Sequence, residues 1–328
     1  MPHAGADNPP SAVVTITGGT GSFGQALTGY LLAQPHGPKV RILSRDEDKQ
    51  EAMSHRFPPG ARMTYILGDV RQRETLTRAF DGTDVVVHGA ALKRVPFGER
   101  NSHEFTLTNV YGSQNVVTAA IECGVKRSLL IGTDKACAPI NAYGLSKALA
   151  SYLFTQGNSL GVSRGCLFGT VRGGNVWGSR GSVGPLWRVL RAEGKPLQVY
   201  GENCTRFHLE MPAWVEFCWR ALNEMHGGET LVPKAKAWKL TDLAAAFGCA
   251  FEVYPPRPGD KQHEFMVSGD EAARTVDLGW AYAIEPPMQF REVWNYRPWP
   301  CPPVCADWRY SSDTVARLTA AELKELAR

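Results

Sequence analysis

The sequence lacks any long apolar run and any strong excess of charge of one sign. No stretch of its 328 residues approaches the roughly 20 apolar residues of a membrane-spanning helix. Its first residues also lack the basic and apolar regions of a signal peptide. Lys and Arg number 36 against 32 Asp and Glu, and no basic run forms a stripe suited to nucleic acid or lipid. These absences predict a cytoplasmic protein that binds neither nucleic acid nor membranes.

The chain also lacks a pattern of paired cysteines. Six of its eight cysteines are scattered through apolar segments, which is typical of buried thiols in a reducing compartment. Only Cys301 and Cys305, in the run CPPVC, are close enough for a disulfide or a metal site. No second Cys or His pair stands at zinc-ligand spacing. The sequence therefore predicts no metal cofactor.

What the chain does have is an alternation of short β-branched runs and helical periods. With 43% apolar residues, it can bury a sizeable core. The expected strands are Val13 to Thr17, Val40 to Ser44, Met63 to Leu67, Asp84 to His88, Leu129 to Thr133 and Cys166 to Val171. The expected helices span about 22–34, 46–56, 72–80, 104–123 and 142–158. This order predicts a Rossmann-like α/β fold with a doubly wound parallel sheet.

The pattern loosens after about residue 175, where Trp, Pro and Gly become frequent. We expect a disordered leader at 1–11, a dinucleotide-binding Rossmann domain at 12–175, and mainly a smaller substrate-binding lobe at 176–328. This expectation leaves room for some segments after residue 175 to return to the Rossmann domain. Near the end, Thr319 and Glu322 form a capping box before a short helix.

The first strand leads into a glycine-rich turn. In the run TGGTGSFG, Gly18, Gly21 and Gly24 have GxxGxxG spacing and precede the first helix. This places Thr20, Ser22 and Phe23 in the same turn. The pattern predicts a dinucleotide whose pyrophosphate faces the helix N-terminus, although such glycines also occur in tight turns without a ligand.

The end of the second strand bears on which dinucleotide is bound. An acidic residue there favours NAD, whereas Arg or Lys favours the 2′-phosphate of NADP. Ser44 and Arg45 come first, with Lys49 four residues later, so the sequence predicts NADP. Asp46 leaves NAD open, and the two cations also fit a solvated helix start. In the run GDV, Asp69 and Val70 are placed to reach the adenine, or Asp69 is a helix cap.

A candidate catalytic group follows the fifth strand. Tyr143 and Lys147 lie four residues apart and share one face of the next helix, where an ammonium favours the phenolate. Thr133, Asp134 and Lys135 end the strand, at the edge where open α/β sheets bind ligands. We expect Lys135 to be a base kept neutral by burial and neighbouring positive charge, and Asp134 an acid. A structural ion pair is the alternative.

Nine runs together resemble inverting UDP-N-acetylglucosamine 4,6-dehydratases, an extended short-chain dehydrogenase/reductase family, and most closely its short, soluble, pseudaminic-acid-type members. The runs are TGGTGSFG, SRDEDKQ, GDVRQ, AALKRVP, TDKACAPINAYGLSK, GNVWGSRGSV, TRF, GGETLVPK and RPGDKQHE. The resemblance covers about residues 12–328. Retaining hexose dehydratases carry Asp-Glu where this chain has Asp134 and Lys135.

The resemblance implies both a reaction and the residues that serve it. Tyr143 and Lys147 would promote oxidation at C4 and also contact the cofactor, with Ala90 and Ala91. Lys135 would take the C5 proton and Asp134 would assist loss of the C6 hydroxyl. Hydride would then return to C6, and reprotonation of C5 from the opposite face would invert it. The residues implied for the UDP-sugar are Lys93, Asn175, Arg180 and Ser182 near the sugar and diphosphate, and Arg206, Arg257 and Glu264 near the UDP. A homo-oligomer, dimer or hexamer, is implied too.

Three positions depart from the family pattern: Gly132 replaces Ser, Gly173 replaces Tyr, and Cys204 replaces Met. The altered pocket wall leaves other UDP-hexosamines open. It also leaves open an elimination that stops at the 5,6-ene. A UDP-hexosamine 4-epimerase and an NADP-binding regulator without chemistry are the further alternatives.

Overall fold

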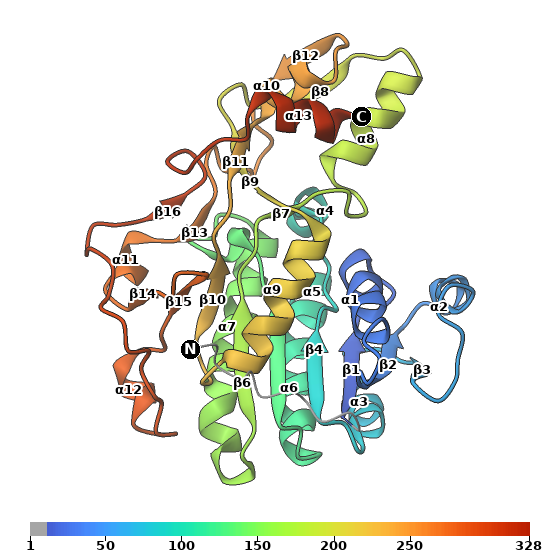
Figure 1. Ribbon diagram of the computed structural model, residues 1–328, viewed down its shortest axis with the longest axis vertical. Helices are drawn as coiled ribbons and strands as arrows, with labels where there is room; N and C mark the ends of the chain where they lie inside the picture. The colour runs from blue at the N-terminus through green and yellow to red at the C-terminus, as the bar shows by residue number, and fades with distance from the viewer. Residues whose placement is uncertain (1–11) are drawn as a thin grey trace.

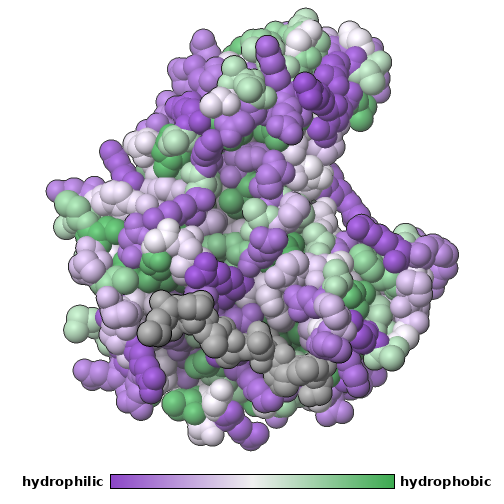
Figure 2. Space-filling view, in the orientation of Figure 1, coloured by the Kyte–Doolittle hydropathy of each residue, from purple (hydrophilic) through white to green (hydrophobic). Residues whose placement is uncertain are grey.

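The computed structural model describes residues 12–328, and the leader expected at 1–11 lies outside these residues. Figure 1 shows a layered body, in which helices flank a central sheet, and a smaller lobe above it. The described part of the chain starts in the body, with β1, and ends in the lobe, with α13. Figure 2 shows that the surface is hollowed between this lobe and the side that carries α1 and α2.

The central sheet has nine strands in the order β14-β15-β10-β6-β5-β4-β1-β2-β3. Its strands are β1 Val13–Thr17, β2 Lys39–Ser44, β3 Met63–Leu67, β4 Val85–His88, β5 Arg127–Ile131, β6 Leu167–Val171, β10 Thr230–Pro233, β14 Thr275–Asp277 and β15 Ala281–Ile284. Neighbours from β3 to β10 are parallel, and β15 and β14 are antiparallel additions. The predicted doubly wound sheet is confirmed. Its strand order reverses between β1 and β4, which creates a crevice at their carboxyl ends.

The helices of the first half follow the sequence pattern with two differences, of which the first is the unexpected helix over 95–100. They are α1 Ser22–Leu32, α2 Glu47–Ser54, α3 Arg73–Phe80, α4 Val95–Arg100, α5 Ser102–Phe105, α6 Gly112–Glu122 and α7 Ala142–Gly161, with 3-10 turns at Asp134–Ala136 and Val162–Arg164. The single helix expected over 104–123 is interrupted by a π-helix, Thr106–Tyr111. Strand β5 ends at Ile131, two residues before the expected end, so Thr133 lies beyond it.

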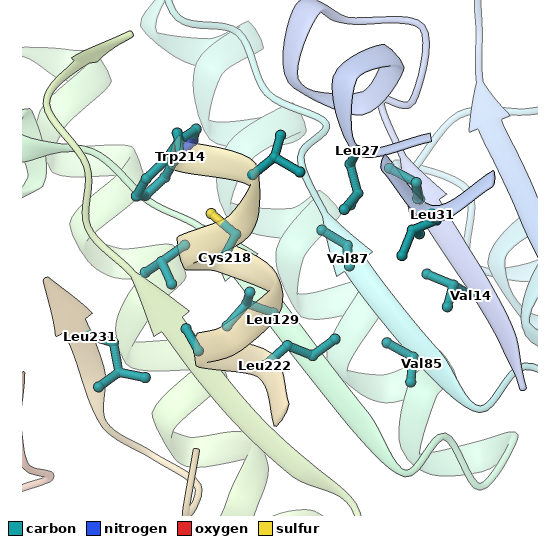
Figure 3. Close-up of a cluster of buried hydrophobic side chains, with 14 of the residues drawn as sticks. Val14, Leu27, Leu31, Val85, Val87, Leu129, Trp214, Cys218, Leu222 and Leu231 are labelled. Carbon is teal, nitrogen blue, oxygen red and sulfur yellow. The ribbon is translucent and has the colours of Figure 1, made fainter. Parts of the chain in front are cut away.

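One helix from the second half of the chain helps to build the main core. Helix α9, Met211–Glu224, packs Trp214, Cys218 and Leu222 against apolar residues of the sheet and of α1 (Figure 3). The labelled partners are Val14, Leu27, Leu31, Val85, Val87, Leu129 and Leu231. Together with β10, β14 and β15, this helix shows that segments after residue 175 return to the main sheet.

The remaining elements build the upper lobe, the connection to it, and a region beside the β14 edge of the sheet that includes α11 and α12 (Figure 1). They are β7 Asn175–Val176, α8 Val183–Ala192, β8 Leu197–Tyr200, β9 Thr205–Leu209, β11 Ala237–Lys239, α10 Leu240–Ala246, β12 Phe251–Tyr254, β13 Phe265–Val267, α11 Gly269–Ala272, α12 Met288–Arg291, β16 Tyr310–Ser311 and α13 Ala320–Ala327. The lobe has its own core, centred on Trp187 and Trp238. The predicted capping box of Thr319 and Glu322 is confirmed at α13.

Candidate active site and dinucleotide cavity

The glycine-rich turn brings β1 and α1 close to the loop after β4. Gly18 has φ +67°, and a Cβ there would lie 2.7 Å from the backbone of Ala90. A Cβ on Gly24 would lie 2.4 Å from the carbonyl oxygen of Gly19. The first glycine therefore permits a left-handed turn and a close approach, and the last permits tight packing of α1.

A cavity of about 260 Å³ opens beside this turn, at the carboxyl ends of β1 to β4. Ten of the residues predicted for the cofactor line it: Gly18, Thr20, Gly21, Ser44, Arg45, Lys49, Asp69, Val70, Ala90 and Ala91. Five others predicted for it do not: Ser22, Phe23, Gly24, Tyr143 and Lys147. Asp46 and Gly68, which belong to the motifs named for the cofactor, line it too. Leu43, Leu92 and Thr108 were missed, and Arg180, predicted for the substrate, also lies in the wall.

The charged groups of the cavity are paired near the surface. Asp46 caps α2 by accepting from the Lys49 backbone N–H at 3.0 Å, and it also pairs with the Lys49 ammonium. These contacts lower the pKa of Asp46. Asp69 lies 2.7 Å from Arg71 and 3.8 Å from Arg45. Burial acts to raise the pKa of Asp69, but the contacts with Arg71 outweigh it and lower the pKa.

The cavity suits a dinucleotide on two structural grounds. Its floor is the glycine turn, where a Cβ on Gly18 would take up the space beside the Ala90 backbone. Its wall includes the Thr108 hydroxyl, which is buried and has no hydrogen-bond partner among the residues that the structure describes. Buried polar atoms are normally partnered, so an unpartnered hydroxyl on a cavity wall indicates a ligand. Thr108 lies in the π-helix, which helical periodicity does not reveal.

The predicted acid and base lie together just after β5. The Lys135 ammonium is 3.0 Å from Asp134 Oδ1, and the Thr133 hydroxyl donates to the same oxygen at 3.1 Å. The Asp134 side chain is only 1% exposed, whereas that of Lys135 is 21% exposed. Burial and the charge of Glu264 raise the pKa of Asp134, which suits the role of an acid.

Glu264 is the residue whose position differs most from its expected role. Instead of grouping with Arg257, it lies beside Lys135, with 3.1 Å between Oε1 and the ammonium. The expectation that neighbouring positive charge keeps Lys135 neutral is wrong. Burial does act to lower the Lys135 pKa, but Asp134 and Glu264 outweigh it and raise that pKa. Two carboxylates, rather than cations, dominate the surroundings of the amine.

Tyr143 and Lys147 both lie on α7 and both are buried. Burial raises the pKa of Tyr143, although its hydrogen bond with Thr133 and the nearby Lys135 act in the opposite direction. Burial also lowers the pKa of Lys147 to about 8. Asn109, which sequence reasoning missed, ties this helix to the loop after β4: its amide donates to the Leu92 carbonyl at 2.9 Å and to the Ser146 hydroxyl at 3.0 Å.

The other residues predicted for the substrate fall into separate places. Partial desolvation and the cations Arg94, Arg180 and Lys135 lower the pKa of Lys93, so these four cations are neighbours. Asn175 Oδ1 and the Ser182 hydroxyl are buried and have no partner among residues 12–328. Arg206 is 3.8 Å from Glu264, beside Lys135. Arg257 pairs with Asp260 at 2.8 Å and lies over the ring of Tyr200.

The departures from the family pattern have local explanations. A Cβ on Gly132 would lie 2.4 Å from the Val171 carbonyl oxygen, and one on Gly173 would lie 2.7 Å from the ring of Trp214. The Trp214 ring therefore occupies space next to Gly173. Cys204 is buried beside the Lys261 carbonyl. Cys301 and Cys305 are free thiols in the structure.

Comparisons with known proteins agree with this architecture. The family model described as polysaccharide biosynthesis protein matches residues 14–286. An inverting UDP-N-acetylglucosamine 4,6-dehydratase of Campylobacter jejuni is 41% identical over 84% of each chain. A UDP-glucose 4-epimerase of Rickettsia massiliae is 37% identical over 95% of this chain and 94% of its own. The X-ray structure of Pen from Bacillus thuringiensis has a TM-score of 0.88, 30% identity and 96% coverage of both chains.

A dTDP-glucose 4,6-dehydratase from Streptomyces venezuelae shares the fold at a TM-score of 0.71, with 19% identity and 96% coverage of both chains. The fold and the site thus define an extended short-chain dehydrogenase/reductase. More particularly, the chain belongs to the polysaccharide biosynthesis protein family, and its resemblance to the inverting UDP-N-acetylglucosamine 4,6-dehydratases is confirmed. Across residues 12–328, none of the helices combines the length and the apolar character needed to cross a membrane.

Proposed function

We propose that the protein converts UDP-N-acetylglucosamine to a UDP-4-keto-6-deoxy hexosamine with inversion at C5. The observation that carries the proposal is the meeting of an acid, a base and a tyrosine, Asp134, Lys135 and Tyr143, at the carboxyl edge of the sheet. An epimerase needs no acid and base for elimination. The relatives named as inverting dehydratases support the same assignment.

Each catalytic side chain has a distinct task in this reaction. Tyr143 accepts the proton of the C4 hydroxyl, with Thr133 as its hydrogen-bond partner and Lys147 four residues along the same helix. Lys135 then takes the C5 proton, which the new C4 ketone has made acidic. Asp134 gives its proton to the departing C6 hydroxyl, so that water leaves. A bound nicotinamide dinucleotide would accept hydride from C4 and return it to C6, while a solvent-derived proton adds to C5 from the opposite face and inverts that centre.

NADP is the dinucleotide that we propose for the cavity. Ser44, Arg45 and Lys49 at its wall provide hydroxyl and cationic donors suited to a 2′-phosphate. Asp46 faces the same cavity, but its carboxylate is already engaged by the backbone and side chain of Lys49. Solved neighbours from Streptomyces venezuelae and Thermus thermophilus have NAD bound, and titration with both dinucleotides tests the preference for NADP.

We place the UDP-sugar between the catalytic centre and the upper lobe. The cations Lys93 and Arg180 suit the diphosphate, and the unpartnered oxygens of Asn175 and Ser182 suit sugar or phosphate groups. Arg257, on the exposed side near Tyr200, remains available to the uridine portion. Arg206 and Glu264 lie instead beside Lys135.

Incubation with UDP-N-acetylglucosamine in deuterated water tests the reaction. A dehydratase loses one water from the sugar and gains deuterium at C5, which mass spectrometry and NMR of the product detect. Proton coupling constants report whether C5 is inverted, and an accumulating 5,6-ene would identify an elimination that stops early. Absence of both water loss and deuterium gain would refute the proposal.

A 4-epimerase is the second candidate, because relatives of that name match 95% of the chain. Lys135→Ala separates the two reactions. If the protein is a dehydratase, this variant loses product formation, since no base remains for C5. If the Lys135→Ala variant still converted a UDP-hexose to its C4 epimer, the epimerase would be favoured.

We further propose a homo-oligomer, as a dimer or hexamer, that works in the cytoplasm, where UDP-sugars are supplied. Leu145, Leu149 and Tyr152 are about half exposed or more along one stripe of α7. Such a stripe on a long helix is suited to packing against a second copy. Light scattering of the protein, and of a Leu145→Glu and Leu149→Glu double variant, tests this assembly.

A further inference from the structure

Glu264 is buried beside the predicted base, although the proposed reaction gives it no task. Its residue is 1% exposed, and Oε1 lies 3.1 Å from the Lys135 ammonium. The Ser312 hydroxyl holds the Glu264 backbone in place: it accepts a hydrogen bond from the Glu264 N–H, with 2.9 Å between nitrogen and oxygen. A buried charge needs an opposite charge, and here that partner is the amine that must move a proton.

Two further cations keep the Glu264 carboxylate ionised. Arg206 Nε is 3.8 Å from Oε1, and Lys261 Nζ is 3.8 Å from Oε2. Both are themselves held in place: Arg206 donates to the Thr205 carbonyl at 2.7 Å, and Lys261 donates to the Cys137 carbonyl at 2.5 Å. Burial acts to raise the pKa of Glu264, but Lys135, Arg206 and Lys261 outweigh it and lower the pKa.

The groups that face Lys135 come from several elements. Asp134 precedes it in the same 3-10 turn, Glu264 directly precedes β13, and Arg206 lies on β9. Tyr143 approaches from α7, and Lys93 follows β4. Of these groups, Asp134 and Glu264 are the carboxylates. Because Asp134 must carry a proton to act as acid, Glu264 is left as the carboxylate that stays charged.

We propose that Glu264 is a positioning residue, which orients the Lys135 amine and stabilises the ammonium that forms as Lys135 takes the C5 proton. The inference rests on the proposed dehydratase reaction. Its geometry resembles the carboxylate that orients a histidine base in hydrolases, in which the carboxylate stabilises the cation formed and is not itself protonated.

The proton balance of the step closes within the site. At the start of elimination, the Lys135 ammonium has passed its proton to Asp134 across their 3.0 Å hydrogen bond, so that Lys135 is an amine and Asp134 a carboxylic acid. Lys135 takes the C5 proton, the C5–H electron pair becomes the C5=C6 double bond, and the C6–O pair leaves as water with the Asp134 proton. The pair ends as ammonium and carboxylate. One proton transfer across their 3.0 Å hydrogen bond restores the starting pair, while Glu264 stays ionised throughout.

Glu264→Gln tests the inference, because the amide keeps the size of the side chain and removes its charge. A charge about 3 Å away in a partly buried site shifts an amine pKa by one unit or more. We expect the rate of C5 deuteration and dehydration to fall at least about tenfold. The pH of maximum rate should move down by about one unit. A wild-type rate and pH profile in this variant would overturn the inference.

Competitive labelling of amines with acetic anhydride provides a readout that needs no substrate. The labelling of Lys135, measured by peptide mass spectrometry against pH, gives its apparent pKa. We expect this pKa to fall by about one unit or more in Glu264→Gln and to stay near the wild-type value in Glu264→Asp, which keeps the charge. An equal pKa in all three proteins would refute the pairing. If the Lys135 pKa falls in Glu264→Gln as expected, but the wild-type protein never dehydrates the sugar, only the proposed function is refuted.

Two other variants control for folding. Glu285→Gln changes a buried carboxylate that pairs with Arg291 at 2.9 Å, away from this cluster, and should leave the pH profile unchanged. Lys261→Met removes a cation that keeps Glu264 ionised, so it should move the acid limb of the rate profile to higher pH. If Glu264→Gln does not fold, this upward shift still tests the inference, and its absence would contradict it.

Discussion

The dinucleotide cavity and the catalytic centre both lie at the carboxyl edge of one sheet, but they handle charge differently. At the cavity, the side chains of Arg45 and Lys49 are 51% and 46% exposed, and each is near a carboxylate. At the catalytic centre, Asp134 and Glu264 are buried on either side of Lys135. The difference indicates that cavity charges act nearly independently, whereas the catalytic charges depend on one another.

The largest expected effect is at the catalytic centre, with Asp134→Asn. Loss of the acid should slow dehydration about a thousandfold, because the C6 hydroxyl no longer receives a proton as it leaves. Lys135 remains, so UDP-N-acetylglucosamine recovered from deuterated water should still gain deuterium at C5. Asp84→Asn, which changes a carboxylate paired with Lys126 at the start of β4, is the control. Equal loss of exchange and dehydration would contradict separate roles for acid and base.

Glu229 extends the comparison to a buried carboxylate that has no ion-pair partner among the described residues. Burial raises the pKa of Glu229 from 4.5 to about 7. The folded pKa lies above the unfolded value, so the folded protein holds the Glu229 proton more tightly than the unfolded chain does. The contribution of protonated Glu229 to the stability of the fold is therefore fully present below pH 4.5 and is lost as the pH rises through about 7. Glu229→Gln should therefore stabilise the protein by about 3 kcal/mol above pH 7 relative to its effect at pH 4.5. Urea unfolding at several pH values measures it, and a pH-independent difference would show that this explanation is wrong.

The close approach at the glycine turn gives the next effect. Gly18→Ala adds a Cβ that would lie 2.7 Å from the Ala90 backbone, so dinucleotide affinity should fall at least about tenfold. Gly124→Ala is a matched control, because Gly124 has φ +68° and nothing within 4 Å of the added Cβ. Both variants should lose about 1–2 kcal/mol of stability. Calorimetry with NADP measures the affinity, and equal binding by both variants would exclude a special role for the Gly18 approach.

The smallest effect concerns cofactor choice. Arg45→Ala should weaken NADP binding about tenfold and leave NAD binding unchanged, since only NADP carries the 2′-phosphate. Arg73→Ala is the control: Arg73, on α3, has a similar exposure and pairs with Glu122 of α6, and neither residue lines the cavity. This variant should change neither affinity. Fluorescence titration with both dinucleotides measures this. If wild-type protein binds NAD as tightly as NADP, the NADP proposal is wrong.

The dinucleotide cavity was largely predictable because each of its walls is a short motif after a strand. Gly18, Arg45, Asp69 and Ala90 follow four consecutive strands, and a parallel sheet brings such loops to one edge. The sequence pattern missed Thr108, since the π-helix around it shifts the helical phase. It also placed Arg180 with the substrate, although the loop after β7 returns this residue to the cavity.

The catalytic motif was equally local, but its electrostatics were not. Asp134, Lys135 and Tyr143 lie within ten residues and were predicted as a group. No sequence pattern predicts that Glu264 lies 3.1 Å from Lys135, because the two residues are far apart along the chain. The expectation that neighbouring positive charge favours the neutral form of Lys135 was wrong for this reason. A pKa depends on burial and on every nearby charge, whatever its position in the sequence.

The amino-acid sequence by itself determined the alternation of strands and helices, the glycine turn, the local acid, base and tyrosine group, and the family resemblance. These features arise from backbone preferences and short spacings, which neighbouring residues set. Only the tertiary structure decided that α9 and β10 return to the main sheet and that Glu264, Arg206 and Lys261 gather at Lys135. Those contacts join distant segments, and their charges act through space rather than along the chain.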